Sequence, residues 1–294
     1  MSISEICVQT DSCDLIELSI LLINVFFKPQ WTYMEELNDT QSESDDRGID
    51  INWVGVSSFK FPVSIQDKSE VQSTVADFKL TVDLPNNQRG THMSRFIEVL
   101  NGYDKTICIK SIKGLNEILV KKLESTDSKI SIKFPYFILK DAPQTGSKGI
   151  VNYGVNLVST LENGSYELIS TVIVPITTLC PCSKAISDRG AHNQRGSVKF
   201  SVKSSNFIWL EDMITLVETS ASSELYSVLK RPDEKLVTER AYDNPVFVED
   251  LVRNVAIKAN QLQEITWYKI EAENFESIHN HNAYAVVENS KENS

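Results

Sequence analysis

Hydrophobic residues between positions 71 and 272 follow strand-like and helix-like spacings in a fixed order, and this order restricts the possible folds more than any other feature of the sequence. Residues 71–84 alternate apolar and polar side chains, from Phe78 to Leu84, as a strand with one buried face does. Two helical spacings and two further alternations follow, at residues 93–100, 115–123, 129–139 and 152–161. We expect Asn101-Gly102 to end the first helix with a left-handed residue.

The second half of the sequence restates this order with little identity to the first half. It predicts a strand, two helices and a final strand, at residues 197–202, 210–220, 246–262 and 265–272. Asn244-Pro245 is a typical start for the longer helix. The order of strands, then two helices, then strands therefore occurs twice in the sequence. This repetition predicts an internal structural duplication and an α+β fold, in which antiparallel sheets carry helices on one face.

Composition and charge restrict the possible partners. Hydrophobic residues make up 41% of the 294-residue chain and charged residues 23%, as in ordinary globular proteins. The formal net charge of −11 argues against nucleic acid or an anionic membrane as a partner, because both need a basic surface. An anionic ligand must therefore be held by a local cluster. The odd number of cysteines, five, is unlike a secreted disulfide framework and favours a reducing cytoplasm.

The N-terminal residues differ from the rest of the chain. Residues 15–27 are apolar but too short to span a bilayer, and acidic residues precede them where a signal peptide has basic ones. We expect a short amphipathic or buried segment there. Residues 38–50 are polar and acidic, which is typical of a linker, so the folded body is expected to begin near Asp50. Residues 1–45 are interpreted as an extension of unassigned role.

Cys180-Pro181-Cys182 and the following His192 have the composition of a metal or thiol site. Thiolate and imidazole are ligands that a zinc-like ion prefers, and Pro181 stiffens the turn between the two sulfurs. The alternative is a loop with two buried cysteines and a solvated histidine.

An open metal site usually takes a third protein ligand, often a carboxylate. Two acidic residues downstream are candidates. Glu234 follows a proline in a segment predicted to be a polar loop, where plain surface charge is the simpler interpretation. Glu249 lies in the first turn of a predicted helix, where an acid commonly complements the helix dipole.

Glu276, His279 and His281 form a second candidate site near the C-terminus. On a helix, the i, i+3 spacing would place Glu276 and His279 on one face. A carboxylate can accept two N–H bonds from an edge such as that of guanine, and a neighbouring imidazole can transfer protons at neutral pH. The alternative is the polar edge of a C-terminal helix.

Residues 87–95 lie between a predicted strand and the start of a predicted helix. Backbone amides at a helix N-terminus, together with Arg89, His92 and Arg95, suit a phosphate group. Alternatively, Thr91 caps the helix and the arginines are solvated.

Together, segments 84–95, 180–195 and 275–281 resemble the type IB GTP cyclohydrolase I family, the alternative to the zinc-dependent type IA enzyme. The resemblance covers residues 46–287. It implies the tunnelling fold, or T-fold, with two tandem strand-strand-helix-helix-strand-strand units, here 46–170 and 171–294. The second unit would carry most site residues. The resemblance also implies a homo-oligomer, for which we expect a tetramer, with active sites between subunits.

The resemblance assigns roles to individual residues. Cys180, His192 and Glu234 would bind manganese, iron or zinc, with Cys180 also counted as catalytic. Glu276 would anchor guanine, and His279 would transfer protons. The candidates for binding the triphosphate are Arg89, His92, Arg95, Lys184 and Arg195. The implied reaction converts GTP and water into 7,8-dihydroneopterin 3'-triphosphate and formate through metal-activated water attack on guanine C8, the first step of tetrahydrofolate and pterin synthesis.

Two other functions remain open. A nitrile reductase of queuosine synthesis shares the tunnelling fold, and there Cys182 would be the nucleophile and NADPH the hydride donor. A binding protein could instead keep the fold and use the metal only for stability.

Overall fold

The computed structural model describes residues 38–68, 70–103, 106–107 and 111–291. Residues Gln41–Ser294 form one compact unit, and Met1–Thr40 are assigned to another. The apolar segment predicted at residues 15–27 lies outside the described residues. The first strand begins at Ile51, which confirms that the folded body starts near Asp50.

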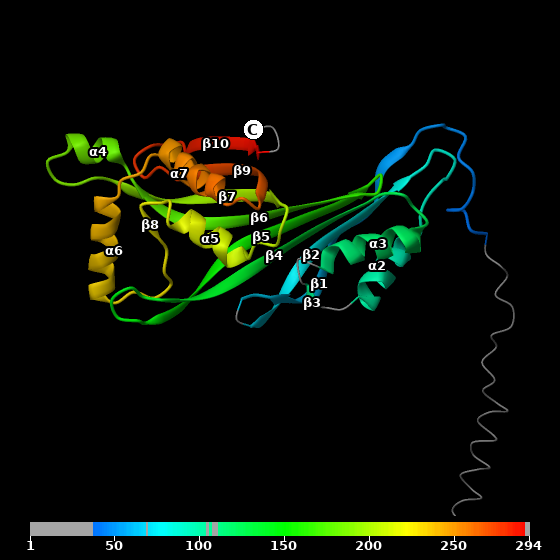
Figure 1. Ribbon diagram of the computed structural model, residues 1–294, viewed down its shortest axis with the longest axis horizontal. Helices are drawn as coiled ribbons and strands as arrows, with labels where there is room; N and C mark the ends of the chain where they lie inside the picture. The colour runs from blue at the N-terminus through cyan, green and yellow to red at the C-terminus, as the bar shows by residue number, and fades with distance from the viewer. Residues whose placement is uncertain (1–37, 69, 104–105, 108–110, 292–294) are drawn as a thin grey trace, which may run out of the picture. The chain divides into compact units, whose positions relative to one another are not determined.

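A single sheet of ten strands forms the framework of the described unit, and nearly all of its strand pairs are antiparallel (Figure 1). The strand order is β10-β9-β7-β6-β5-β4-β2-β1-β3, and β8 pairs with β6 beside this path. The strands are β1 (Ile51–Gln66), β2 (Val71–Leu84), β3 (Thr106–Ile107), β4 (Ser128–Asp141), β5 (Lys148–Glu162), β6 (Ser165–Leu179), β7 (Asn193–Ser204), β8 (Ser223–Glu224), β9 (Ile265–Asn274) and β10 (Ala283–Ser290).

A two-residue turn joins the two halves of the sheet. Glu162 of β5 is the register partner of Ser165 of β6, so Asn163 and Gly164 alone connect the strands. Both turn residues have positive φ, 51° and 77°, which is the conformation that an Asn-Gly hairpin favours. The turn therefore places β6 directly beside β5.

Helices cover one face of the sheet. They are α2 (Met93–Gly102), α3 (Ile112–Leu123), α5 (Leu210–Glu218) and α7 (Val248–Gln261), and their buried residues belong to the same core cluster as the sheet. Val155, Val172, Phe200 and Ile270 are successive register partners from β5 to β9 and continue that core across the strands. The α+β class and its antiparallel sheet are therefore as predicted.

The predicted strands and helices all occur, but several local predictions were wrong. α2 continues through Gly102 and ends at an extended Tyr103, so the expected left-handed stop is absent at Asn101-Gly102. The left-handed residue is Glu124, which ends α3 with a φ of 58°. The sequence patterns also did not locate β1, β6 or β10.

Two shorter or more polar helices lie at the end of the sheet where β6 finishes, α4 (Pro181–Ile186) and α6 (Arg231–Asp243) (Figure 1). The polar loop predicted around Glu234 is in fact the first turn of α6. Glu276 and His279 do not lie on a helix, because residues 275–282 form the connection between β9 and β10.

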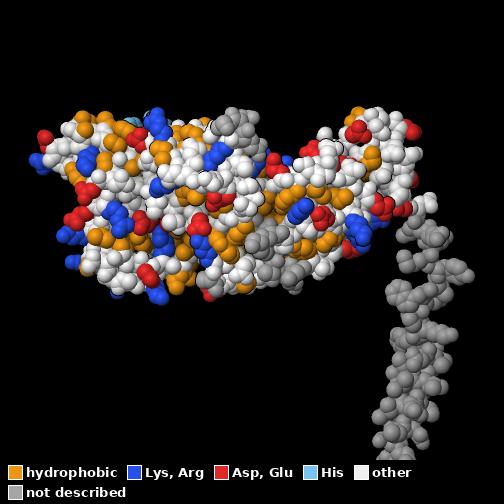
Figure 2. Space-filling view, viewed as in Figure 1, with side chains coloured by type: hydrophobic (Ala, Val, Ile, Leu, Met, Phe, Trp, Pro, Cys, Tyr) orange, Lys and Arg blue, Asp and Glu red, His pale blue; other side chains and the backbone are white. Residues whose placement is uncertain are grey.

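Acidic and basic side chains are interspersed on the face shown in Figure 2. Among the described residues, the structure contains no helix long and apolar enough to cross a membrane.

Candidate active site

Cys180 lies between the last residue of β6 and the first residue of α4. Its backbone is extended and its Sγ accepts a hydrogen bond from Ser183 N at 3.4 Å, so Cys180 is the N-cap of α4. Pro181 occupies the first helical position, where its missing N–H leaves no intrahelical partner unpaired. The Cys180 side chain is half-buried, whereas Cys182 is exposed.

The loop after α4 returns the chain to the same edge of β6. Leu179 pairs with Asn193, and Cys180 N donates to His192 O at 3.1 Å, so Cys180 and His192 are neighbours at the ends of two adjacent strands. Gly190 has a φ of 130°, a conformation that L side chains rarely adopt, and this residue permits the return.

The His192 imidazole is held by side chains from two segments. Its Nδ1 lies 2.9 Å from Gln194 Oε1 and 3.3 Å from Ser277 Oγ. Its backbone N–H donates to Ser183 Oγ at 3.2 Å. The first turn of α4, the start of β7 and the connection between β9 and β10 therefore meet at this histidine.

Glu276 and His279 lie on the β9–β10 connection, at the end of the sheet that also carries α4 (Figure 1). Glu276 Oε1 accepts from Gln194 Nε2 at 3.3 Å, and Glu276 Oε2 lies 3.6 Å from His279 Nδ1. The His192 and His279 ring centroids are 6.5 Å apart, and those of His279 and His281 are 5.2 Å apart. The predicted pairing of Glu276 with His279 therefore occurs, although a loop and not a helix produces it.

Lys184 and Arg195 are close in sequence to Cys180 and His192, but the two basic side chains have different contacts. Lys184 Nζ bonds the carbonyl of Tyr242 and lies 4.3 Å from the centroid of that ring, which connects α4 to the C-terminal end of α6. Arg195 is exposed on β7, and its carbonyl accepts from Phe275 N at 2.9 Å. Arg195 therefore adjoins the connection that carries Glu276.

Glu234 is not brought to this cluster within one chain. It is exposed in the first turn of α6, and Tyr242, which contacts Lys184, lies about 12 Å further along the helix axis at about 1.5 Å per residue. In the part of the chain that the structure describes, no three His, Cys, Asp or Glu side chains are grouped closely enough to hold a metal ion.

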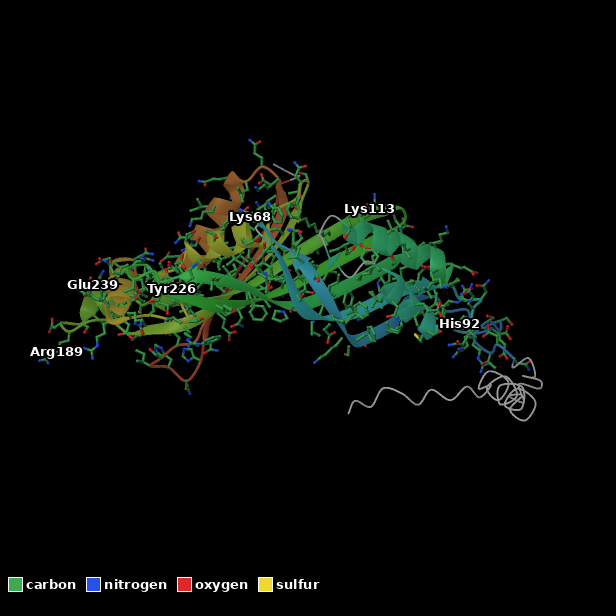
Figure 3. All side chains as sticks on the ribbon, turned by 90° about the horizontal axis from the view of Figure 1, so that it is seen from below. Lys68, His92, Lys113, Arg189, Tyr226 and Glu239 are labelled. Carbon is green, nitrogen blue, oxygen red and sulfur yellow. The ribbon has the colours of Figure 1, made fainter. Side chains whose placement is uncertain are left out.

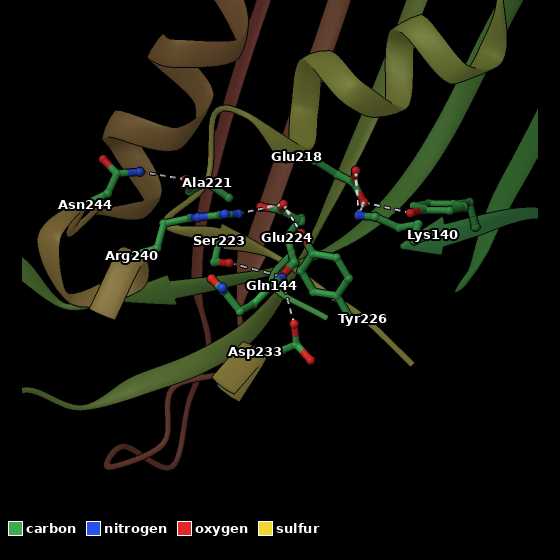
Figure 4. A network of polar contacts seen from close by, with 11 residues as sticks. Lys140, Gln144, Glu218, Ala221, Ser223, Glu224, Tyr226, Asp233, Arg240 and Asn244 are labelled. Carbon is green, nitrogen blue, oxygen red and sulfur yellow. Dashed lines mark hydrogen bonds and ion pairs between the residues drawn. The ribbon is translucent and has the colours of Figure 1, made fainter. Parts of the chain in front are cut away.

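A buried carboxylate fixes the N-terminus of α6 (Figure 4). Asp233 is fully buried and accepts hydrogen bonds from Gln144 N at 2.8 Å, Thr145 N at 2.9 Å, Thr145 Oγ1 at 2.6 Å and Lys230 N at 2.9 Å. Burial acts to raise the pKa of Asp233, but these hydrogen bonds outweigh it and hold the pKa at about 2. The β4–β5 connection and α6 are therefore tied together next to Glu234.

The three other basic residues predicted to bind phosphate, Arg89, His92 and Arg95, lie elsewhere in the same unit. His92 and Arg189, a residue of the loop between Cys180 and His192, are at opposite ends in Figure 3. Arg89 pairs with Glu43, and Arg95 Nη1 lies 3.9 Å from Glu124 Oε1. The alternative interpretation of this segment was wrong in one respect, because the N-cap of α2 is His92 and not Thr91.

The donor atoms at the end of β6 and β7 suit a divalent transition metal. Cys180 offers a sulfur and His192 an imidazole nitrogen, and these donor types are compatible with zinc, iron or manganese, although no third His, Cys, Asp or Glu among the described residues completes a metal site with them. The donor chemistry thus fits the metal that the resemblance implies, with Glu234 as the one expected ligand that a single chain does not supply.

Two residues of this cluster, Gln194 and Ser277, are not among those predicted from the sequence. Gln194 is in phase with Val198 and Phe200 on the buried face of β7, so an amide among apolar strand positions was an available signal. Nothing in the spacing around Ser277 distinguishes it from other loop serines.

The family model and the curated relatives that match this chain are described as GTP cyclohydrolases. Residues 37–285 match a family model described as type I GTP cyclohydrolase folE2. The chain is 53% identical over 259 residues to the GTP cyclohydrolase FolE2 of Akkermansia muciniphila. The aligned region covers 87% of this chain and 98% of that protein. It is 51% identical over 254 residues to the GTP cyclohydrolase FolE2 of Thiobacillus denitrificans, and the aligned region covers 86% of this chain and 94% of that protein.

Among solved structures, the uricase from Arthrobacter globiformis aligns with a TM-score of 0.49 and 7% sequence identity, covering 83% of this chain and 94% of that chain.

Proposed function

The chain belongs to the type I GTP cyclohydrolase FolE2 family, and from this membership we propose that it hydrolyses GTP to 7,8-dihydroneopterin 3'-triphosphate and formate. This reaction begins pterin and tetrahydrofolate synthesis. The observation that carries the proposal is the similarity to GTP cyclohydrolases over most of the chain. The odd number of cysteines supports a cytoplasmic location.

We propose that Cys180 and His192 hold a manganese, iron or zinc ion, because the fold places them on neighbouring strand ends. When bound, such an ion acts as a Lewis acid that activates water for attack on guanine C8. Glu234 is the proposed third ligand. Since it lies apart from Cys180 in one chain, its participation requires a second copy of the chain or a movement of α6.

Glu276 and His279 would act on the guanine base. The Glu276 side chain is 10% exposed, and its carboxylate can accept N–H groups from the edge of guanine. His279 is about half exposed and lies beside Glu276, so its imidazole can give a proton to the nitrogen released when the ring opens. The same imidazole could later assist ring closure.

Lys184 and Arg195 are the proposed triphosphate ligands from the same chain. Arg89, His92 and Arg95 would come from a neighbouring subunit, because within one chain His92 lies at the end opposite to Arg189, a residue of the loop between Cys180 and His192 (Figure 3). This arrangement fits a tunnelling fold with tandem units near 46–170 and 171–294. The sheet leaves β10 and β3 as its edges, and pairing of edges between copies would close a ring, for which we propose a tetramer.

Product analysis tests this proposal. The purified protein is loaded with manganese, iron or zinc and incubated with GTP in the absence of NADPH. We expect formate and pterin fluorescence to appear together. Absence of both products with all three metals would refute the activity. NADPH oxidation with a nitrile-bearing purine analogue would instead favour the reductase interpretation.

A further inference from the structure

Gln194 is a buried amide that contacts both parts of the proposed site. Its side chain lies at the start of β7, and the residue is 7% exposed. Gln194 Oε1 lies 2.9 Å from His192 Nδ1, while Nε2 donates to Thr178 Oγ1 at 3.1 Å and to Glu276 Oε1 at 3.3 Å. One side chain therefore connects the proposed metal ligand to the proposed guanine anchor.

The carboxylate of Glu276 determines which way the amide faces. An ionised carboxylate can only accept hydrogen bonds, so the NH₂ group of Gln194 must point toward Glu276. The reverse orientation would place the amide oxygen against a carboxylate oxygen, with no proton between them. The Thr178 hydroxyl accepts from the same NH₂ group and is fully buried. The Gln194 carbonyl oxygen is consequently left facing His192.

This orientation determines the tautomer of His192. A carbonyl oxygen only accepts, so His192 Nδ1 must carry the proton in the contact at 2.9 Å. Ser277 Oγ, 3.3 Å from the same nitrogen, can accept from it as well. The lone pair of the neutral ring is then on Nε2, the nitrogen that remains available to a metal ion.

We infer that Gln194 is a positioning residue, which fixes His192 in the Nδ1–H tautomer and at the same time holds the carboxylate of Glu276. The consequence of this dual contact rests on the proposed function, in which His192 binds metal and Glu276 binds guanine. Burying an amide on the apolar face of β7 is unfavourable unless its donors and acceptor are paired, and here they are paired with site residues.

The tautomer can be measured without metal or GTP. Metal-free protein labelled with ¹⁵N-histidine is studied by long-range ¹H–¹⁵N correlation at about pH 8.5, where imidazole is neutral. His192→Asn identifies the His192 signals among the four histidines. The wild type is expected to show Nδ1–H at His192, and Gln194→Leu is expected to shift the ring substantially toward Nε2–H. A wild-type Nε2–H ring, or an unchanged tautomer in folded Gln194→Leu, would overturn the inference.

Two further variants separate positioning from simple packing. Gln194→Glu keeps an acceptor for Nδ1–H but opposes the Glu276 carboxylate, so the tautomer should persist while KM for GTP rises. Thr178→Val removes only the third contact of the amide and should leave the tautomer unchanged. If Gln194→Leu fails to fold, Gln194→Glu decides the inference, because loss of the Nδ1–H tautomer in that variant contradicts it.

Metal binding provides the link to the proposed function. Competition with a chromophoric chelator should show about 10- to 100-fold weaker manganese binding in Gln194→Leu, the usual effect of removing a partner that orients a ligand. Unchanged manganese affinity in a folded variant would contradict a role toward the metal. If the wild type shows the expected tautomer and metal binding but makes no formate from GTP, the proposed function fails and the positioning role of Gln194 stands.

Discussion

Cys180 has two separable roles, because its sulfur caps α4 and is also a proposed metal ligand. Cys180→Ser should keep the folded state, since a serine Oγ can accept the Ser183 N–H as an N-cap. The same change should abolish tight metal binding and lower GTP turnover by on the order of a thousandfold. Circular dichroism, metal analysis and formate release measure the three effects.

Cys182→Ser is the matched control for this prediction. Cys182 is exposed, so its replacement should leave folding, metal content and turnover unchanged. Loss of folding in Cys180→Ser would favour a structural metal site. Loss of activity in Cys182→Ser with metal retained would favour a nucleophilic cysteine.

Glu224 should make the stability of the protein depend on pH in the acidic range. Burial acts to raise the pKa of Glu224. A hydrogen bond from Tyr226 and the charges of Arg240 and Lys140 lower the pKa by more than burial raises it, so the net pKa is below its ordinary value (Figure 4). The ionised form therefore stabilises the folded state above the ordinary glutamate pKa of about 4.3, and this contribution is lost as pH falls through the lower folded pKa.

Urea unfolding from pH 6 downward tests this dependence in Glu224→Gln. The wild type should have the larger free energy of unfolding at pH 6, and the difference from the variant should shrink as the pH falls. Glu239→Gln, which removes a negative charge from the exposed side of α6, is the control and should show a smaller difference. A difference between wild type and Glu224→Gln that grows with acidity would contradict the sign of the pKa shift.

At the scale of elements, α3 shows how a helix is held by one face. Leu115, Leu119 and Leu123 are buried against the sheet, whereas Ile118 is 46% exposed. Leu119→Ala should lower the free energy of unfolding by about 2–5 kcal/mol, because it leaves a cavity in the core. Ile118→Ala on the same helix should cost less than about 1 kcal/mol. Urea denaturation of both variants checks the contrast, and equal costs would contradict this packing.

α6 and the β9–β10 connection show where reasoning from spacing fails. α6 buries only Asp233 and Ala241, so it has no apolar stripe for a periodicity to detect. Its N-terminus is instead held by the polar contacts of Asp233 with the β4–β5 connection. The i, i+3 spacing of Glu276 and His279 suits a helix, but a tight loop places the same two side chains together.

At the scale of the whole molecule, the proposed site is divided between distant parts of one chain. Cys180 and His192 lie where β6 and β7 meet, on either side of the loop that carries Arg189, whereas His92 lies at the end opposite to Arg189 (Figure 3). If both sets act on one GTP molecule, they must come from different subunits. In that case the site would be a property of the assembly.

Subunit mixing tests the division of the site. Cys180→Ser and Arg95→Ala are each expected to be nearly inactive alone. After joint dissociation and reassembly, random pairing should restore about a quarter of wild-type activity, because half of the paired subunits are mixed and each mixed pair has one intact site. Mixing each variant with itself is the control. No recovery, despite mixed oligomers shown by native mass spectrometry, would contradict a shared site.

The α+β class, the family and the positions of most helices and strands could be predicted from the sequence. This was possible because the spacing of apolar residues is a local property, and because residues 84–95, 180–195 and 275–281 form a specific combination. The sequence also identified Cys180, His192, Glu276 and His279 as candidates from their chemistry alone.

Which of these candidates lie together could be seen only in the folded chain. The register that pairs Leu179 with Asn193 brings Cys180 beside His192, and the β9–β10 connection adds Glu276 and Ser277. The inferred positioning role of Gln194 depends on its contact with His192. Glu234 lies away from this cluster because it is in the first turn of α6. The physical reason is that strand register and loop paths depend on packing across the whole sheet, whereas the sequence reveals only the period of each segment.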